Sequence, residues 1–248
     1  MEDILVLENV HKHYPGAEVP ALQGLSLQFR KGIIAGLLGP NGAGKTTTIS
    51  IICGLVNQDS GVVTAMGLDN KTDLVGIKKR IGLVTQHTAL YPQLSAQENL
   101  EYIGRLYQIP GRKLKSRIQE LLVRFGLLPN AHKRIVNYSG GMKRRANIIA
   151  ALLHEPELLI LDEPTAGVDV QSRAMILDFL QHYNQEGNSL IYTSHLLEEA
   201  EKICHEVAII DSGQLIAKGT PAALIQQSTN CNNLEEVFLH YTGRTVRE

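Results

Sequence analysis

The sequence of 248 residues predicts an α/β fold with a mostly parallel sheet, an N-terminal antiparallel β subdomain and a helical insert. Residues 4–10 and 22–29 alternate between apolar and polar, which is typical of antiparallel strands with one wet face. Helical periodicity dominates from about residue 88 to residue 151. Runs that are apolar on both faces, as in buried parallel strands, lie at 33–38, 158–161, 190–193 and 207–210.

In the first half of the chain, local signals place three helices. A helix is expected from Lys45 to about Leu55, after the apolar run at 33–38. Ser95 and Glu98 form a capping-box pattern, which predicts a helix start. A further helix is predicted by apolar residues at helical spacing, namely Leu114, Ile118, Leu121, Leu122 and Phe125.

In the C-terminal part of the chain, local signals predict three helices and a hairpin. A long helix is expected from Ser172 to Gln185, with Gly187 as its stop. The pair Ser212-Gly213 predicts a hairpin turn between two strands. Thr220-Pro221 predicts the start of a short helix, because proline suits the first helical position. Another helix is expected after Asn233, in a tail that continues through Thr242-Gly243-Arg244.

Composition disfavours several classes of function. The chain has a formal net charge of -1 and no tryptophan, so nucleic-acid binding is not expected. Its three cysteines show no paired spacing, which indicates a reducing compartment. The N-terminus lacks a signal-peptide pattern, and the apolar runs are far too short to span a bilayer. We therefore expect a cytoplasmic protein that reaches a membrane only through a partner.

One stretch matches the phosphate-binding pattern G-x-x-x-x-G-K-[ST]. It consists of Gly39, Pro40, Asn41, Gly42, Ala43, Gly44, Lys45, Thr46 and Thr47. Glycines let the backbone N–H groups approach phosphate oxygens, and the helix start adds unpaired N–H groups. Lys45 supplies a full charge, and Thr46 a hydroxyl for Mg²⁺. A chance glycine turn is disfavoured, because a buried strand precedes the loop and a helix follows it.

Two carboxylates follow the buried strand at 158–161. Ligands bind at the C-terminal edge of parallel strands, so Asp162 is placed to hold Mg²⁺. Glu163 could polarise an attacking water as a general base. Taken alone, the pair could equally well be acidic residues that enter a turn before Pro164. The presence of the phosphate loop favours the catalytic interpretation.

A second anion-binding helix start is predicted at Ser139-Gly140-Gly141. Serine suits an N-cap, and the two glycines expose backbone N–H groups. Taken alone, this pattern is more simply a capped helix. Together with the phosphate loop, it gives one chain two sites of phosphate-binding type.

These motifs occur in an order that resembles the ATPase subunit of ATP-binding cassette (ABC) transporters, over essentially the whole chain. The matching positions are Tyr14, the phosphate loop, Gln86, Ser139, Gly140, Gly141, Asp162, Glu163, Asp169 and His195. The resemblance implies an ABC ATPase fold that forms one domain over residues 1–248. Its P-loop nucleotide triphosphatase core would cover about 1–87 and 152–248, and its helical subdomain 88–151.

The resemblance also implies roles for single residues and the cofactors ATP and Mg²⁺. Tyr14 would stack on adenine, and Asp169 would lie in a dimer-contact loop. Gln86 would touch both Mg²⁺ and the attacking water. Glu163 would be the catalytic carboxylate, and His195 would donate a hydrogen bond to the γ-phosphate.

A head-to-tail homodimer is implied as well, in which Ser139, Gly140 and Gly141 of one subunit close over the γ-phosphate held by Lys45 of the other. ATP would close this dimer and hydrolysis would release it. A separate transmembrane permease would use the motion. Ser139-Gly140-Gly141 matches the signature motif of the family. The flanking residues Tyr138 and Met142 resemble those of the branch that exports drugs, polysaccharides and lipids.

Three other functions fit the sequence less well. A soluble ABC ATPase of translation or DNA repair is disfavoured, because such proteins usually carry two cassettes or a long coiled coil. An importer ATPase is disfavoured by the lack of a C-terminal regulatory domain. A kinase is disfavoured because Glu163 beside Asp162 favours water as the acceptor. The sequence does not identify a transported substrate.

Overall fold

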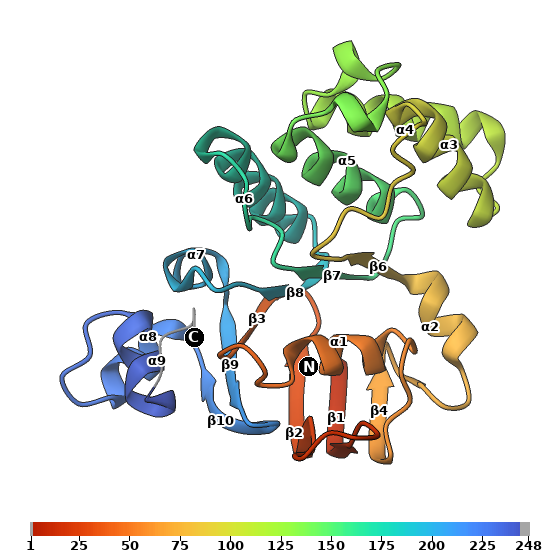
Figure 1. The fold of residues 1–248 in the computed structure, drawn as a ribbon. Helices are drawn as coiled ribbons and strands as arrows, with labels where there is room; N and C mark the ends of the chain where they lie inside the picture. The colour runs from red at the N-terminus through yellow and green to blue at the C-terminus, as the bar shows by residue number, and fades with distance from the viewer. Residues whose placement is uncertain (1, 244–248) are drawn as a thin grey trace.

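The computed structural model describes residues 2–243 (Figure 1). Met1 of the predicted domain and Arg244 of the predicted C-terminal tail therefore lie outside the described residues. A six-stranded sheet has the order β10-β9-β3-β8-β7-β6, in which only β10 runs antiparallel to its neighbour. Its strands are β3 (Ile34–Leu38), β6 (Ile81–Val84), β7 (Leu158–Asp162), β8 (Ser189–Thr193), β9 (Glu206–Asp211) and β10 (Gln214–Gly219).

A second sheet is antiparallel, in the order β2-β1-β4-β5. Its strands are β1 (Asp3–Lys12), β2 (Leu22–Arg30), β4 (Ser60–Ala65) and β5 (Leu68–Asp69). The alternation at 4–10 and 22–29 correctly predicted the antiparallel β1–β2 pair. The sequence patterns did not predict β4 and β5.

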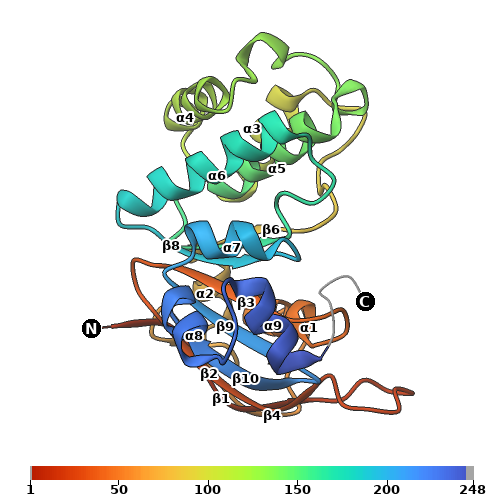
Figure 2. The same ribbon diagram turned by 90° about the vertical axis from the view of Figure 1, so that its left-hand side faces the viewer.

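Helices occupy the remaining faces (Figures 1 and 2). They are α1 (Lys45–Ile52), α2 (Leu74–Arg80), α3 (Ala96–Leu106), α4 (Gly111–Arg124), α5 (Gly140–Leu152), α6 (Val170–Gln185), α7 (Leu197–Ile203), α8 (Pro221–Gln227) and α9 (Leu234–Thr242). Two 3₁₀ turns, Leu128–Asn130 and Ile135–Asn137, precede α5. No helix among residues 2–243 has both the length and the hydrophobicity to cross a membrane.

Two helix boundaries differ from the expectations. Helix α1 ends at Ile52 rather than near Leu55, because Gly54 takes the left-handed conformation with φ 62°. Helix α6 begins at Val170, two residues before the expected start, because the Asp169 side chain caps it. The hairpin was correctly predicted: Ser212 and Gly213 both have positive φ, as a type I′ turn requires.

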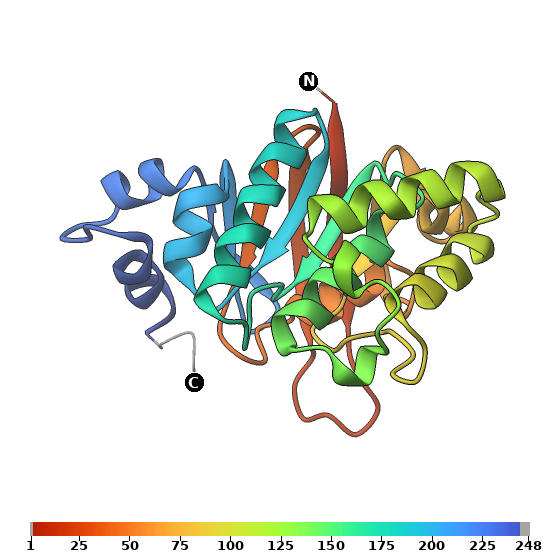
Figure 3. The ribbon, with the colours of Figure 1, turned by 90° about the horizontal axis from the view of Figure 1, so that it is seen from above.

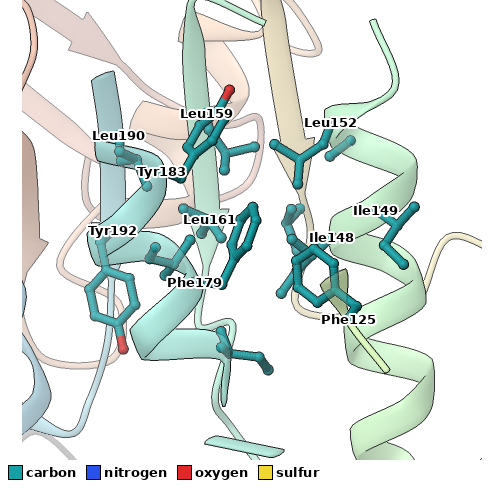
Figure 4. Close-up of a cluster of buried hydrophobic side chains, with 14 of the residues drawn as sticks. Phe125, Ile148, Ile149, Leu152, Leu159, Leu161, Phe179, Tyr183, Leu190 and Tyr192 are labelled. Atoms are coloured by element: carbon teal, nitrogen blue, oxygen red, sulfur yellow. The ribbon is translucent and has the colours of Figure 1, made fainter. Parts of the chain in front are cut away.

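The six-stranded sheet separates two hydrophobic clusters. Leu158 and Ile160 of β7 face the cluster formed with β1, β2, β4 and α1. Leu159 and Leu161 of the same strand face the cluster formed with α3 to α6, α8 and α9. Figure 4 shows the second cluster where β7 and β8 meet α5 and α6. Seen from above, the helices of the insert cover one side of the sheet, while α8 and α9 lie beyond its other end (Figure 3).

Candidate functional site

The phosphate loop connects β3 to α1. Gly44, at the helix N-cap, has φ 104°, and a β carbon there would lie 2.7 Å from the carbonyl oxygen of Ala21. Only glycine therefore fits this position. The Lys45 side chain is buried, and its Nζ donates to the carbonyl oxygens of Gly39 at 2.6 Å and Pro40 at 3.0 Å. Incoming phosphate oxygens would replace these two acceptors.

Charges from neighbouring strands act on Lys45. Burial lowers the pKa of its ammonium, while the charges of Glu163 and Asp162 oppose this shift. Because β3, β8 and β7 are adjacent and parallel, their C-terminal ends bring the phosphate loop and both carboxylates to one edge of the sheet. The structure thus brings together the phosphate loop and the acidic pair that the sequence predicted.

Thr193, at the end of β8, orients both carboxylate residues. Its hydroxyl donates to Oδ1 of Asp162 at 2.8 Å and accepts from the backbone N–H of Glu163 at 3.0 Å. Burial raises the pKa of Asp162, and the hydrogen bond from Thr193 opposes that rise. The charge of Glu163 raises the pKa further, whereas Lys45 lowers it.

Glu163 is the centre of the predicted catalytic group. Nε2 of Gln86 donates to its Oε2 at 2.9 Å, and Nδ1 of His195 lies 3.2 Å from its Oε1. The three predicted catalytic residues therefore meet, although they come from three separate loops. Glu163 also has φ 50°, in the left-handed region that side chains other than glycine rarely adopt.

A different group of predicted residues gathers at the start of α5. The Ser139 hydroxyl accepts from the backbone N–H of Met142 at 3.2 Å, which confirms the predicted cap. A β carbon on Gly141 would lie 2.2 Å from Oγ of Ser172 and 2.7 Å from Oδ2 of Asp169. The signature thus packs closely against the loop that contains Asp169.

Helices α1 and α5 lie on opposite faces of the six-stranded sheet. Ile49 of α1 belongs to one hydrophobic cluster and Ile148 of α5 to the other. Figure 1 shows the same separation, with α1 below the strands β6 and β7 and α5 above them. The two predicted anion-binding helix starts therefore belong to different layers of the same chain.

The side chains suit a hard divalent cation such as Mg²⁺. Thr46, exposed in the first turn of α1, offers a hydroxyl, and Asp162 retains the carboxylate oxygen that Thr193 does not bind. Gln86 uses its amide nitrogen on Glu163, so its amide oxygen is still available. Hydroxyl, carboxylate and amide oxygens are the donor types that Mg²⁺ prefers.

The remaining predicted binding residues lie in the phosphate loop itself and on the segment that follows β1. Pro40 is buried, while Asn41 and Gly42 are exposed at the tip. Tyr14 lies two residues after β1, and the Lys12 ammonium is 5.5 Å from its ring centre. The segment that follows Tyr14 returns to the phosphate loop, where Ala21 contacts Gly44.

Two residues of this site were not singled out from the sequence. In the sequence, Thr193 only ends the apolar run at 190–193, and Arg144 stands within the basic run Lys143-Arg144-Arg145. The Arg144 guanidinium is buried and contacts the backbone of both Gln86 and Glu163. Since these partners are distant in sequence, no local pattern could have identified either residue.

Comparison with known families agrees with this geometry. The family model described as ABC transporter matches residues 22–166. The chain belongs to the ABC transporter family. It is similar to the linearmycin resistance ATP-binding protein LnrL of Bacillus subtilis (strain 168), with 48% identity over 221 residues, which cover 89% of this chain and 70% of that protein.

Two further ABC proteins extend the comparison. The daunorubicin resistance ATP-binding protein DrrA3 of Streptomyces coeruleorubidus is 38% identical over 216 residues, covering 87% of this chain and 68% of that protein. A dimeric, post-hydrolysis structure of the ATP-binding cassette MJ0796 with ADP and Pi is 26% identical, with a TM-score of 0.80, covering 87% of this chain and 98% of that one. The predicted fold class, ABC ATPase activity and exporter-type transport function are confirmed.

Proposed function

We propose that two copies of this chain close head to tail on ATP and Mg²⁺, and that hydrolysis drives a separate membrane permease in export. The observation that carries the proposal is the arrangement around Glu163. Gln86 and His195 both contact its carboxylate, and the carboxylate lies at the same sheet edge as the phosphate loop. A water held there would face the terminal phosphate of a bound triphosphate.

Each side chain then has a distinct task. Lys45 would bind phosphate oxygens, and Glu163 would polarise the attacking water. His195 would donate a hydrogen bond to the γ-phosphate, and Tyr14 would stack on adenine. Mg²⁺, held by Thr46, Asp162 and Gln86, would neutralise charge on the phosphates.

The dimer follows from the separation of α1 and α5. Because the two helix starts belong to opposite layers, we infer that Ser139, Gly140 and Gly141 serve the nucleotide of the partner copy, with Asp169 at the contact. One two-fold interface would then complete two equivalent sites. The dimeric state named for the similar ATP-binding cassette MJ0796 supports this arrangement.

Two variants test the composite site. Glu163→Gln should retain ATP binding, lose about 10²-fold or more of its turnover and accumulate as a nucleotide-bound dimer in size-exclusion chromatography. Ser139→Arg should abolish hydrolysis while the monomer still binds ATP in calorimetry. Near-normal hydrolysis by Glu163→Gln would remove the carboxylate from its catalytic role. Turnover by Ser139→Arg would contradict the site formed between subunits.

We further infer that the permease docks in a groove between the core and the helical insert. The groove has a volume of about 380 Å³, and a mostly apolar lining that includes Leu55, Leu83, Ala89 and Tyr107. Its wall at Ala89 belongs to the loop that contains Gln86, so a partner seated there would touch the segment that carries a proposed catalytic residue. The protein would thereby lie at the cytoplasmic face of the membrane without entering it.

Asn147 gives this groove a polar anchor. The side chain is 4% exposed, and its Oδ1 accepts from the backbone N–H of Ala89 at 3.3 Å. Its Nδ2 is buried and has no hydrogen-bond partner among residues 2–243. An unpaired buried donor is costly, so Asn147 is an unusual polar group in the mostly apolar wall of the groove.

A further inference from the structure

The side chain of Arg144 joins helix α5 to two loops of the nucleotide site. Its Nη1 donates to the carbonyl oxygen of Thr85 at 2.6 Å. Its Nη2 donates to the carbonyl oxygens of Gln86 at 2.9 Å and Glu163 at 3.0 Å. The residue is 6% exposed, so water cannot readily replace these acceptors. A planar guanidinium with three short contacts fixes the relative positions of all three carbonyls.

The backbone of Glu163 needs such support. A left-handed conformation is unfavourable for a residue that has a β carbon, and Glu163 has φ 50°. Its N–H is held by Thr193, and its carbonyl accepts from Arg144 and from the backbone N–H of Ala166 at 3.2 Å. Strained conformations of this kind persist only where surrounding contacts over-determine them. Of the groups that hold the Glu163 backbone, Arg144 is the one that also holds Gln86.

The same guanidinium also holds the partner of the Glu163 carboxylate. Gln86 donates from its side chain to Oε2 of Glu163, and its own carbonyl accepts from Arg144. Both members of this hydrogen bond are thus attached through their backbones to one rigid group. A shift of Arg144 would move the carboxylate and the amide together.

We propose that Arg144 is a positioning residue for ATP hydrolysis, which holds the backbones of Glu163 and Gln86 so that the carboxylate stays aimed at the attacking water. The proposal rests on the proposed catalytic role of Glu163 and goes beyond it. It makes the position of that carboxylate depend on α5, the helix that Ser139 caps and that also carries Asn147 of the docking groove.

The competing explanation is that Arg144 only stabilises the fold and does not position Glu163. Arg80 provides a control for this explanation. This arginine lies directly before β6, at the end of the sheet away from the nucleotide. Its Nε and Nη2 donate to the Glu157 carboxylate at 2.6 Å and 2.7 Å, and its Nη1 donates to the carbonyl of Met66 at 3.3 Å. Arg80 thus joins separate elements of the core, as Arg144 does, without touching a catalytic residue.

The first experiment compares steady-state ATP hydrolysis and thermal unfolding of the full chain and its variants. Arg144→Gln should lower kcat about tenfold or more, because small misplacements of a reacting group are costly, while KM for ATP stays within about twofold. Arg144→Lys should retain intermediate activity, since an ammonium cannot span three carbonyls. Arg80→Gln should leave kcat unchanged. A folded Arg144→Gln or Arg144→Lys variant with wild-type kcat would overturn the proposal.

The second experiment places Arg144→Gln in a Glu163→Gln background. If Arg144 acts through Glu163, the added substitution should change residual turnover by less than about twofold, because groups that act as a unit are not additive. An equal loss in both backgrounds would overturn the positioning role and leave the role of Glu163 intact. Near-normal turnover by Glu163→Gln alone would overturn the catalytic role of Glu163, and the positioning role with it.

Discussion

Replacement of Thr193 by valine tests how the acidic pair is held. Valine has nearly the shape of threonine but no hydroxyl, and the residue is fully buried, with 0% exposure. The substitution removes the donor to Oδ1 of Asp162 and the acceptor for the N–H of Glu163. Packing around the side chain should stay almost unchanged, so the effect reports these two hydrogen bonds.

The two bonds set the expected magnitude. A hydrogen bond to a charged group contributes about 1.5–3 kcal/mol, and a buried donor left unpaired costs about 1–3 kcal/mol. Asp162 and Glu163 are only half-buried, so water can replace part of the lost hydroxyl. We therefore expect Thr193→Val to lower the free energy of unfolding by about 2–4 kcal/mol at neutral pH.

The loss should depend on pH with a definite sign. Burial holds the pKa of Asp162 above its ordinary value of 3.8, and the Thr193 hydroxyl opposes this rise. Without the hydroxyl the pKa rises further. A carboxyl with a raised pKa in the folded chain destabilises the fold when ionised, and this cost disappears once both states are protonated. The part of the loss that comes from Asp162 should therefore shrink as pH falls toward 3.8.

Urea denaturation between neutral and mildly acidic pH measures these effects. Thr193→Ser is the matched control, because it keeps the hydroxyl and loses only a methyl group. Serine should cost clearly less than valine at neutral pH. The reasoning is refuted if valine and serine destabilise equally, or if the valine variant loses less than about 0.5 kcal/mol, the range of neutral surface changes.

Two further substitutions test packing and docking. Gly141→Ala should lower the free energy of unfolding by about 1–3 kcal/mol, because its β carbon would lie 2.2 Å from Oγ of Ser172. Gly140→Ala should not, since its nearest neighbour would be 3.7 Å away; equal stability of the two variants would contradict the close packing. Leu55→Glu in the groove should reduce capture of the permease from detergent-solubilised membranes, whereas Val123→Glu, on α4 and similarly exposed, should not. Equal capture by both would place the permease elsewhere.

Local patterns predicted those features whose signal lies within a few consecutive residues. The phosphate loop and the capping box at Ser95 and Glu98 are of this kind, and the structure has both hydrogen bonds of that box. Strand β4 was missed because Ser60–Ala65 has little apolar alternation. It forms through its pairing with β1, where the paired residues are 49 to 60 positions apart, from His11↔Ser60 to Leu5↔Ala65.

The contacts that hold Asp162 and Glu163 could not be predicted for the same reason. Thr193 binds Asp162 across 31 positions, and Arg144 binds Thr85 across 59 positions. In the sequence, Arg144 stands in a basic run that is typical of a solvated helix surface. In the fold, its guanidinium is buried against backbone carbonyls, which a pattern of neighbours cannot indicate. The residues that carry the chemistry could therefore be predicted from the sequence, whereas the contacts that position them could be identified only in the structure.

The placement of α1 and α5 in different layers also bears on when ATP is consumed. In the proposed dimer, each copy carries half of two sites, so turnover by the free chain should rise with the square of its concentration when dimers are rare. A permease that holds two copies replaces this encounter with an effective concentration in the millimolar range. Assembly on the membrane would then increase hydrolysis by proximity alone, and unassembled copies would spare cellular ATP.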